Sequence, residues 1–420
     1  MAILLVLAGL AGGLIWFGIH ELPYGLRSRE TENVWFESDP SRVYENTICR
    51  FSHQYRTNVH PLFPLLAFPA FTVVSKIARL GADRTVDVLL ILAAVLWPAL
   101  MYWLLRLLSF DRATSALMAA AGSLSTVFLL FFSVPETYAL SSIGILLALA
   151  ILHVSENKRY ERLGFVSAGV LTFGITVTNW AVALAGTVRA RSMKEWIRIS
   201  AYAFYAVMTL WGVEKVICPS AKFFTELGEE KGYVVRLSPK RIASVLDVMA
   251  FHVVIAPAVE QTRDYGINEK LGPAWNTGLT LQNALPGSAS PWGIGAVAIW
   301  SVVLVLGLSS MARRLGHSRV LFAATAFLVF QVALHSVYGV ETFMYGLDWL
   351  PLLMIAGAYG FQRLGPGKFP AMLAFLFLLG INNLREFQTV AALVRGFEQA
   401  HPVHHALAPV DAIPKDPLCR

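Results

Sequence analysis

The chain has 420 residues, of which 56% are hydrophobic and only 15% are charged. A mean hydropathy of +0.58 leaves too little polar surface for a water-soluble globular protein, so the sequence predicts an integral membrane protein. The formal net charge of +7 does not indicate nucleic-acid binding. The basic residues lie in short clusters between apolar runs, where membrane orientation explains them better.

Apolar runs near the roughly 20 residues that a membrane-crossing helix needs recur along nearly the whole chain. The first run, residues 2–19, lacks a basic start and a small-residue cleavage site, so we interpret it as a retained helix and not as a signal peptide. The expected fold is an all-α polytopic membrane protein with about eleven transmembrane helices. Helices are expected over residues 1–19, 85–106, 114–132, 136–154, 163–188 (a span or a short hairpin), 196–213, 292–312, 319–338, 345–362 and 369–384.

Three stretches are not expected to cross the bilayer: a first loop over residues 20–58, a central segment over 214–291 and a C-terminal tail over 387–420. The segment 59–80 is apolar enough to cross, but Pro61, Pro64 and Pro69 remove helix hydrogen bonds that lipid cannot replace. We therefore interpret 59–80 as a juxtamembrane helix. In the central segment, the apolar stretch 242–258 is typical of a helix lying along the interface.

The distribution of basic residues predicts the orientation, because such residues concentrate in cytoplasmic loops. The largest number falls inside when 59–80 stays on the outer surface and 163–188 folds as a hairpin. The N-terminus is then inside and the three long segments are outside, which suits a bacterial inner membrane with periplasmic loops. The basic residues placed inside are Arg106, Arg112, Lys158, Arg159, Arg162, Arg189, Arg191, Lys194, Arg198, Arg313, Arg314, Arg319, Arg363 and Lys368.

The cysteines and the tail histidines give no strong metal signal. Cys49, Cys218 and Cys419 fit no metal-ligand spacing, and all three are expected outside. A Cys49–Cys218 disulfide is one interpretation, and three free thiols is the favoured one. The histidine-rich run 401–405 lacks a nearby Cys or acid, so it is interpreted as an exposed run. No Gly-rich phosphate loop follows a strand, which argues against an ATP-driven pump.

The first loop is the most informative polar stretch. Its carboxylates, Arg and His lie between two membrane-embedded elements, and loops held on a rigid scaffold often carry function. A carboxylate beside a Pro turn, followed by Arg and His before an apolar helix, provides a base and cations near a lipid phosphate. A solvated loop whose charges pair with one another is the simpler alternative. The candidate residues are Asp39, Arg42, His53, Arg56 and His60.

Two shorter outer connections carry further candidates. Glu136 and Tyr138 lie in the connection SVPETYALSS, where Glu136 is either a first-turn acid favoured by the helix dipole or a second carboxylate facing the first loop. Glu341 and Tyr345 lie at another outer helix end. Ionisable groups near membrane depth usually face a cavity or a partner. Asn179 is expected at the tip of the hairpin, where polar contacts between helices explain it equally well.

The order of these features resembles the GT-C superfamily of membrane glycosyltransferases, which includes protein O-mannosyltransferases and lipid A aminoarabinose transferases. Asp39 matches the acid of that family's first outer loop, and Glu136 in PETY matches an acid of a second outer loop. His60, followed by Pro61, resembles a basic-Pro element that opens a juxtamembrane helix. Relatives often have Lys where His60 stands, and metal-using relatives have two acids in the second loop. These departures weaken the case for a divalent metal cofactor.

The resemblance covers residues 1–190 and implies that they form the family's shared membrane module, with variable helices over 191–386. It implies an inverting glycosyltransferase that moves a sugar from a polyprenyl-phosphate donor to a glycan, lipid or protein acceptor at the outer face. Asp39 would be the general base, and Glu136 would orient the acceptor. The departing phosphate would be stabilised by cations. Those cations would be Arg56 and His60, with Arg42 as a further candidate, while Tyr138, Glu341, Tyr345 and His53 would contact the substrate.

Three other functions remain open at this point. A non-catalytic membrane scaffold would keep the helices but would not need acids and cations converging on one side. A transporter or flippase of a lipid-linked saccharide would use the same cavity and cations without a base, although such proteins usually show matched halves. An O-antigen polymerase or ligase is the third alternative, and the long outer segment suits such an enzyme as well.

Overall fold

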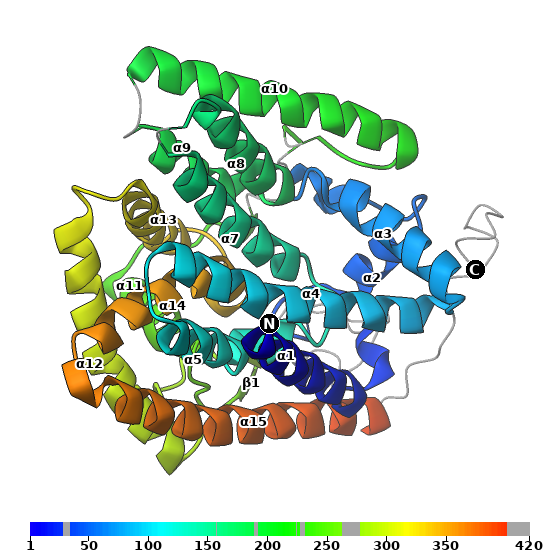
Figure 1. Ribbon diagram of the computed structural model, residues 1–420. Coiled ribbons are helices and arrows are strands. Elements are labelled where there is room, and N and C mark those ends of the chain that lie inside the picture. The colour runs from blue at the N-terminus through cyan, green and yellow to red at the C-terminus, as the bar shows by residue number, and fades with distance from the viewer. Residues whose placement is uncertain are drawn as a thin grey trace.

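The computed structural model describes residues 1–27, 34–156, 158–188, 192–223, 225–226, 232–262 and 278–400. These residues form a bundle of helices with one small antiparallel sheet, in which Glu260 pairs with Thr280 (Figure 1). The α-helices are α1 (Ala2–Glu21), α2 (Pro40–Ile48), α3 (Phe63–Ala78), α4 (Ala82–Leu107), α5 (Arg112–Ser123), α6 (Thr126–Phe131), α7 (Thr137–Ser155), α8 (Glu161–Ile175), α9 (Trp180–Val188), α10 (Met193–Ile217), α11 (Pro239–Asp247), α12 (Pro291–Arg314), α13 (Arg319–His335), α14 (Gly346–Gln362) and α15 (Lys368–Ala400). The short helices are η1 (Tyr24–Arg27), η3 (Tyr55–Asn58), η4 (Val177–Asn179), the π-helical turn η6 (Val248–His252), η7 (Thr342–Tyr345) and η8 (Gly365–Gly367), and the strands are β1 (Glu260–Thr262) and β2 (Gly278–Thr280).

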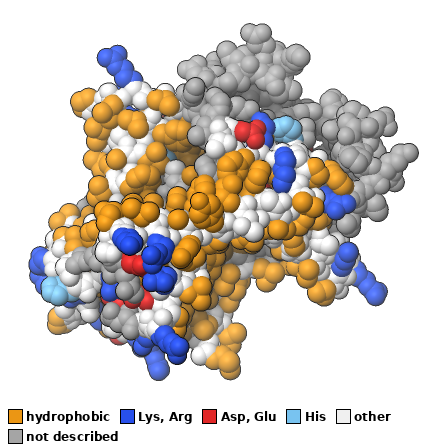
Figure 2. Space-filling view, turned by 90° about the horizontal axis from the view of Figure 1, so that it is seen from above, with side chains coloured by type: hydrophobic (Ala, Val, Ile, Leu, Met, Phe, Trp, Pro, Cys, Tyr) orange, Lys and Arg blue, Asp and Glu red, His pale blue; other side chains and the backbone are white. Residues whose placement is uncertain are grey.

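Five of the described helices are long and apolar enough to cross a bilayer: α1, α4, α7, α12 and α15. Many side chains on their outer surfaces are apolar, such as Val6 (70% exposed) and Val305 (68% exposed). Hydrophobic side chains cover much of the face in Figure 2, with Lys and Arg in a few groups. An apolar outer surface of this extent suits lipid and not water. The prediction of an integral, largely helical membrane protein is thus confirmed, while the count of about eleven spans stays a prediction.

One end of the bundle gathers basic residues from several connections. Lys368 at the start of α15 pairs with Asp111 before α5, with Nζ and Oδ2 2.7 Å apart. Arg319 at the start of α13 pairs with Glu156 and Glu161 in the connection between α7 and α8. We call this end of the bundle the basic end. Its position on the inner side of the membrane stays a prediction, and the assignments of Arg189 and Arg191 lie outside the described residues.

The opposite end, which we call the site end, carries the first loop. Segment 163–188 forms a hairpin, one of the two alternatives expected for it, because α8 and α9 run in opposite directions. The tip of the hairpin lies beside the start of α7, where Asn179 Nδ2 donates to Ser141 Oγ (2.5 Å). Both ends of α3 also lie at the site end. Leu62 N–H, just before α3, donates to Gly174 O near the hairpin tip (2.7 Å). Asp83, just after α3, accepts a hydrogen bond from Tyr44 of the first loop, so α3 does not cross the bundle.

The central segment differs from the expected interfacial helix over 242–258. Only α11 and η6 are helical, and the following residues, such as Val254, are fully buried within the bundle. Their backbone groups pair with neighbouring elements: Val254 O accepts from Thr126 N–H, and Ala256 N–H donates to Asn383 Oδ1. The same pairing explains why the predicted helix 114–132 divides into α5 and α6. Backbone groups at this depth need protein partners because lipid offers none.

Two further expectations need correction or extension. Cys49 is disulfide-bonded and Cys218 is a buried free thiol, so the Cys49–Cys218 pair and the set of three free thiols are both wrong. The helix expected over 369–384 continues as α15 to Ala400, where its last turns pack beside the end of α1 through an ion pair between Arg395 and Glu21 (2.6 Å). The assignments of Cys419 and the histidine-rich run 401–405 lie outside the described residues.

Candidate active site

A small cleft lies at the site end, with a cavity volume of about 20 Å³. Seven of the nine residues that the sequence predicted for the site line it, and they come from the first loop, the start of α7 and the connection before α14. We call it the site cleft. Its lining residues are Glu37, Ser38, Asp39, Arg42, Arg56, His60, Glu136, Tyr138, Tyr233, Gly339, Met344 and Tyr345.

The backbone just before Asp39 adopts an unusual conformation. Phe36 and Glu37 both have positive φ angles, 51° and 57°, which residues other than Gly rarely adopt. Phe36 is fully buried, with its ring 5.3 Å from that of Phe343. The Glu37 carboxylate accepts a hydrogen bond from Glu341 N–H (2.9 Å). Packing and hydrogen bonding thus hold two strained residues in place, and strain of this kind concentrates at functional sites.

Asp39 and Arg42 form an ion pair within the cleft. Asp39 occupies the N-cap position of α2, yet its carboxylate makes no capping bond and accepts from Arg42 Nε instead (3.2 Å). Pro40 at the first helical position explains why the helix begins here, since Pro needs no N–H partner. The Arg42 guanidinium also lies over the ring of Tyr55, 5.7 Å from its centroid. The pair therefore supplies a carboxylate and a cation side by side.

Arg56 is the second cation of the cleft and is 9% exposed. It belongs to η3, which is tied to the start of the central segment: Thr57 Oγ1 donates to Lys222 O (2.7 Å), and Asn58 Nδ2 donates to Glu226 O (3.1 Å). Its guanidinium lies 5.7 Å from the ring centroid of Tyr233, also in the central segment. Residues far apart in sequence thus fix the position of Arg56.

His60 is buried and neutral. Burial, together with the nearby charges of Arg56 and Arg42, lowers the pKa of its imidazole to about 3. Its Nδ1 lies 3.0 Å from Ile175 O, which can only accept, so Nδ1 carries the proton and Nε2 accepts from Thr137 Oγ1 (3.3 Å). The expected cationic contact of His60 with a phosphate therefore does not fit this environment, and Arg56 and Arg42 are the cations of the cleft.

A chain of hydroxyl groups leads from His60 into the bundle. Thr176 Oγ1 lies 3.2 Å from His60 Nδ1 and 3.1 Å from Ser141 Oγ. Ser141 Oγ donates to Asp348 Oδ1 on α14 (2.7 Å) and accepts from Asn179 Nδ2. Asp348 is the last group of this chain. This network joins the first loop, α7, the hairpin tip and α14 beneath the cleft.

Glu136 is the second carboxyl group of the cleft, and it is 5% exposed. It forms the N-cap of α7, where its Oε2 accepts from Thr137 N–H (2.6 Å). Burial raises the pKa of the Glu136 carboxyl to about 7, against the opposing effect of Arg42. Glu136 therefore both caps the start of α7 and lines the site cleft, the two alternatives that the sequence left open. A carboxyl group with a pKa near neutrality can exchange protons at physiological pH.

Aromatic rings form one wall of the cleft. The ring of Tyr138 lies 5.8 Å from that of His60 and 5.4 Å from that of Tyr345, both in edge-to-face arrangements. Gly339 lies beside Tyr345 with a φ of +78°, and a Cβ there would come 2.9 Å from the Tyr345 ring. Aromatic faces and hydroxyl groups of this kind suit a sugar ring.

Two of the predicted residues do not line the cleft. Glu341 is fully buried behind it, where it accepts a hydrogen bond from Thr280 Oγ1, and burial raises the pKa of its carboxyl to about 8. His53 packs against the ring of Tyr55, with centroids 5.2 Å apart. Conversely, Glu37 and Tyr233 line the cleft and were not predicted. Glu37 stood in the same acidic run as Asp39, but no local pattern in the sequence marks Tyr233.

The described residues contain no group of three or more His, Cys, Asp or Glu side chains placed to hold a metal ion. The charges of the cleft come instead from carboxyl groups interleaved with Arg42 and Arg56. Such a lining can bind an anionic group and exchange a proton beside it.

Comparisons with known sequences identify no family, and comparison with solved structures gives a weak likeness. No family model matches the chain, and no curated protein matches it. Among solved structures, the apo oligosaccharyltransferase of Archaeoglobus fulgidus aligns with a TM-score of 0.47 and 14% identity over 94% of this chain. The chain spans 55% of the length of that protein. The function is therefore argued from the geometry of the site cleft.

Proposed function

We propose that the protein is a GT-C-type membrane glycosyltransferase that moves a sugar from a polyprenyl-phosphate donor to an acceptor. The observation that carries this proposal is the site cleft. Asp39, Arg42 and Arg56 of the first loop meet Glu136 from the start of α7 there, beside a wall of tyrosine rings. The chemistry of such a transfer needs a base for the acceptor, cations for the phosphate and a surface for the sugar.

Asp39 is the proposed general base. It takes the proton from an acceptor hydroxyl as the oxygen bonds to the anomeric carbon, and the bond from that carbon to the phosphate oxygen breaks on the opposite face, with inversion. Glu136 orients the acceptor hydroxyl. Its pKa near 7 makes it a second carboxyl group able to take up that proton.

Arg42 and Arg56 are proposed to bind the phosphate that leaves with the polyprenyl chain. Both side chains are 9% exposed, so a phosphate between them would lie in a poorly hydrated site where charge-assisted hydrogen bonds are strong. His60 serves as a neutral group that supports the cleft through the hairpin tip. Tyr138 and Tyr345 contact the sugar.

The site cleft is proposed to face the outer, periplasmic side of a bacterial inner membrane. The basic end lies at the opposite end of the bundle, and basic residues concentrate on the cytoplasmic side. A disulfide at Cys49 in the first loop fits an oxidising compartment as well.

The test is transfer of radiolabelled sugar from a panel of polyprenyl-phosphate sugars by the purified protein in lipid nanodiscs. Membrane extract supplies the acceptors. Asp39→Asn should abolish transfer, while Asp247→Asn, the same change at the end of α11 and away from the site cleft, should leave it intact. Transfer by a folded Asp39→Asn variant at the native rate would refute the assignment of the base.

The same preparation separates the proposal from the transporter alternative. A flippase would move a fluorescent lipid-linked saccharide between the leaflets of a vesicle without forming a glycosidic bond. Saturable binding of the lipid, movement across the bilayer and no transfer with any donor would replace the enzyme proposal with the transporter. An O-antigen polymerase or ligase would instead use a donor linked through a pyrophosphate, so such donors belong in the panel.

A further inference from the structure

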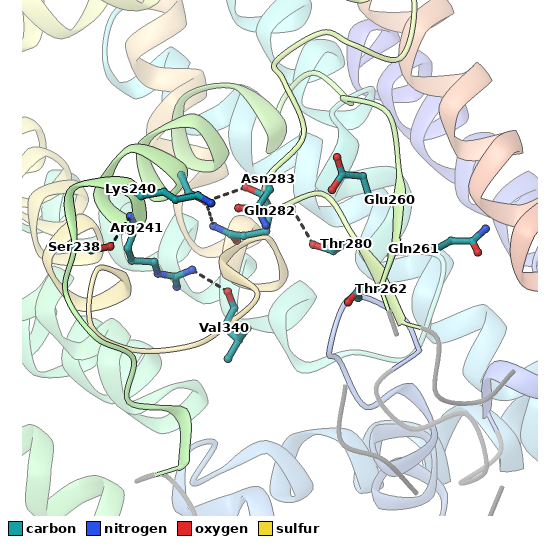
Figure 3. A pocket seen from close by; sticks show the side chains of 11 residues that line it. Ser238, Lys240, Arg241, Glu260, Gln261, Thr262, Thr280, Gln282, Asn283 and Val340 are labelled. Atoms are coloured by element: carbon teal, nitrogen blue, oxygen red, sulfur yellow. Dashed lines mark hydrogen bonds between the residues drawn. The ribbon is translucent and has the colours of Figure 1, made fainter. Parts of the chain in front are cut away.

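A second and larger cleft lies next to the site cleft, with a cavity volume of about 620 Å³. Its sides are formed by α11, by β1 and by the residues from Thr280 to Asn283, with Val340 at one edge (Figure 3). We call it the polar cleft. Nothing in the proposed chemistry uses it.

The two clefts share one stretch of chain in their walls. Gly339 lines the site cleft, and its neighbour Val340 lines the polar cleft. Arg241 of α11 holds this stretch through its guanidinium, which donates to Val340 O (2.9 Å), to Gly339 O and, through Nε, to His335 O (3.1 Å). The wall between the clefts is therefore thin and fixed in position.

The floor of the polar cleft continues into the site region. Gln282 and Thr280 are each 6% exposed. Gln282 Oε1 accepts from Thr342 N–H (2.7 Å), and Thr280 Oγ1 donates to the Glu341 carboxylate. Glu341 N–H in turn donates to Glu37 of the site cleft (2.9 Å). A ligand resting on this floor would lie two side chains away from the proposed reaction centre.

The lining identifies the class of ligand. Among the described residues that line the polar cleft, none is aromatic and Val340 is the one apolar side chain, so this lining does not suit a lipid tail. The other side chains are mostly hydroxyls and amides, which both donate and accept hydrogen bonds as sugar hydroxyls do. Lys240 on α11 and Glu260 on β1 carry opposite charges on different sides, and Arg241 donates to backbone carbonyls (Figure 3). Two cations and one carboxylate leave the described lining with a formal charge of only +1, and the more numerous hydroxyl and amide groups favour a neutral ligand.

We infer that the polar cleft binds a neutral saccharide that forms part of the acceptor. The role of the saccharide as an acceptor rests on the proposed transferase function. The binding of a saccharide in the polar cleft does not. A saccharide held in the polar cleft could reach past Gly339 with its terminal hydroxyl and present it to the carboxyl groups of the site cleft. The enzyme would then extend or modify an existing glycan.

The test measures binding of fluorescent neutral hexasaccharides of glucose, mannose and N-acetylglucosamine to the full chain in nanodiscs. Asn283 stands exposed at the rim of the polar cleft. Asn283→Ala should weaken binding of the matching hexasaccharide about tenfold, as the loss of one or two hydrogen bonds predicts. Asn283→Trp should fill the cleft and abolish binding. Gln388→Ala, an amide truncation on the exposed face of α15, is the matched control and should leave binding unchanged.

The outcomes separate the two proposals. Asp39→Asn should abolish transfer but leave hexasaccharide binding intact. If no donor supports transfer while binding and its loss in Asn283→Trp persist, the transferase proposal fails and the polar cleft stands. If transfer occurs but Asn283→Trp changes neither hexasaccharide binding nor the KM for the acceptor, the polar cleft proposal is overturned. Binding of none of the three hexasaccharides, or of a neutral hexapeptide in their place, would also overturn it.

Discussion

The change Glu136→Gln tests the electrostatics of the site cleft directly. Gln keeps the size of the side chain and an oxygen that can accept from Thr137 N–H, so the cap of α7 is preserved. What it removes is the titration of a buried carboxyl group. The variant should therefore change how the stability of the protein depends on pH, more than it changes the fold.

The sign follows from the direction of the pKa shift. Burial raises the pKa of Glu136 from 4.5 to about 7, so the folded protein holds a proton that the unfolded chain has already released. Stability from this group is fully present below pH 4.5 and falls as the pH rises through about 7. A difference of about 2.5 pKa units corresponds to about 3 kcal/mol of unfolding free energy lost at pH 8.5. In a chain of this length that is a shift of a few degrees in Tm.

The assay is thermal unfolding of the purified protein in nanodiscs at pH 5 and pH 8.5. The Tm of Glu136→Gln should be close to that of the native chain at pH 5 and a few degrees higher at pH 8.5. Glu398→Gln, near the end of α15, is the control, because Gln keeps an oxygen that accepts from Gly25 N–H. The Tm of this variant should retain the native pH dependence. An equal difference in Tm between Glu136→Gln and the native chain at both pH values would refute the burial argument.

Three further changes test the support of the cleft and the packing of the bundle. Thr176→Val should lower the unfolding free energy by about 1–2 kcal/mol, because it removes the hydroxyl that links His60 to the rest of the hydroxyl chain. The control Thr172→Val, one turn earlier, loses only a hydrogen bond within its own helix. Equal losses in Tm for the two variants would contradict this. Arg56→Lys keeps the charge but loses the planar fork, so kcat/KM for a polyprenyl-phosphate donor should fall about tenfold, and an unchanged value would argue against phosphate binding there. Gly360→Ala should lower the yield of folded protein in detergent, as measured by size-exclusion chromatography, because its Cβ would meet a backbone carbonyl of α12. The control Gly9→Ala places its Cβ in open space and should behave as the native chain does.

The chemistry of the candidate site could be predicted in large part from local sequence. A Pro after Asp39 and a Pro before Glu136 mark helix starts, and an acid beside such a start stays at the outer end of its helix. The structure brings both residues to one cleft, together with Arg42 and Arg56. Local pattern could not give the partners from distant segments. Tyr233 reaches Arg56 across the fold, and nothing near position 233 in the sequence marks it.

The charge of His60 shows a second limit of sequence reasoning. A His before Pro suggests a basic group. Its protonation depends on burial and on Arg42 and Arg56 nearby, and these lower the pKa to about 3. Desolvation penalises the charged form, and its size depends on neighbours that only the folded chain supplies. The pairing of Cys49 is decided in the same way, by distance in space and not by spacing in the sequence.

The sequence by itself determined the helical membrane architecture. Apolar runs long enough to span a bilayer can be recognised in it directly, and a backbone in lipid has no water to bond with, so it must form its hydrogen bonds within helices. The tertiary structure alone decided what lies between those helices. Residues near Val254 fold back into the bundle, since their carbonyls find partners on α6 and α15. Long-range hydrogen bonds of this kind depend on the whole arrangement of helices, and no local pattern of residues encodes them.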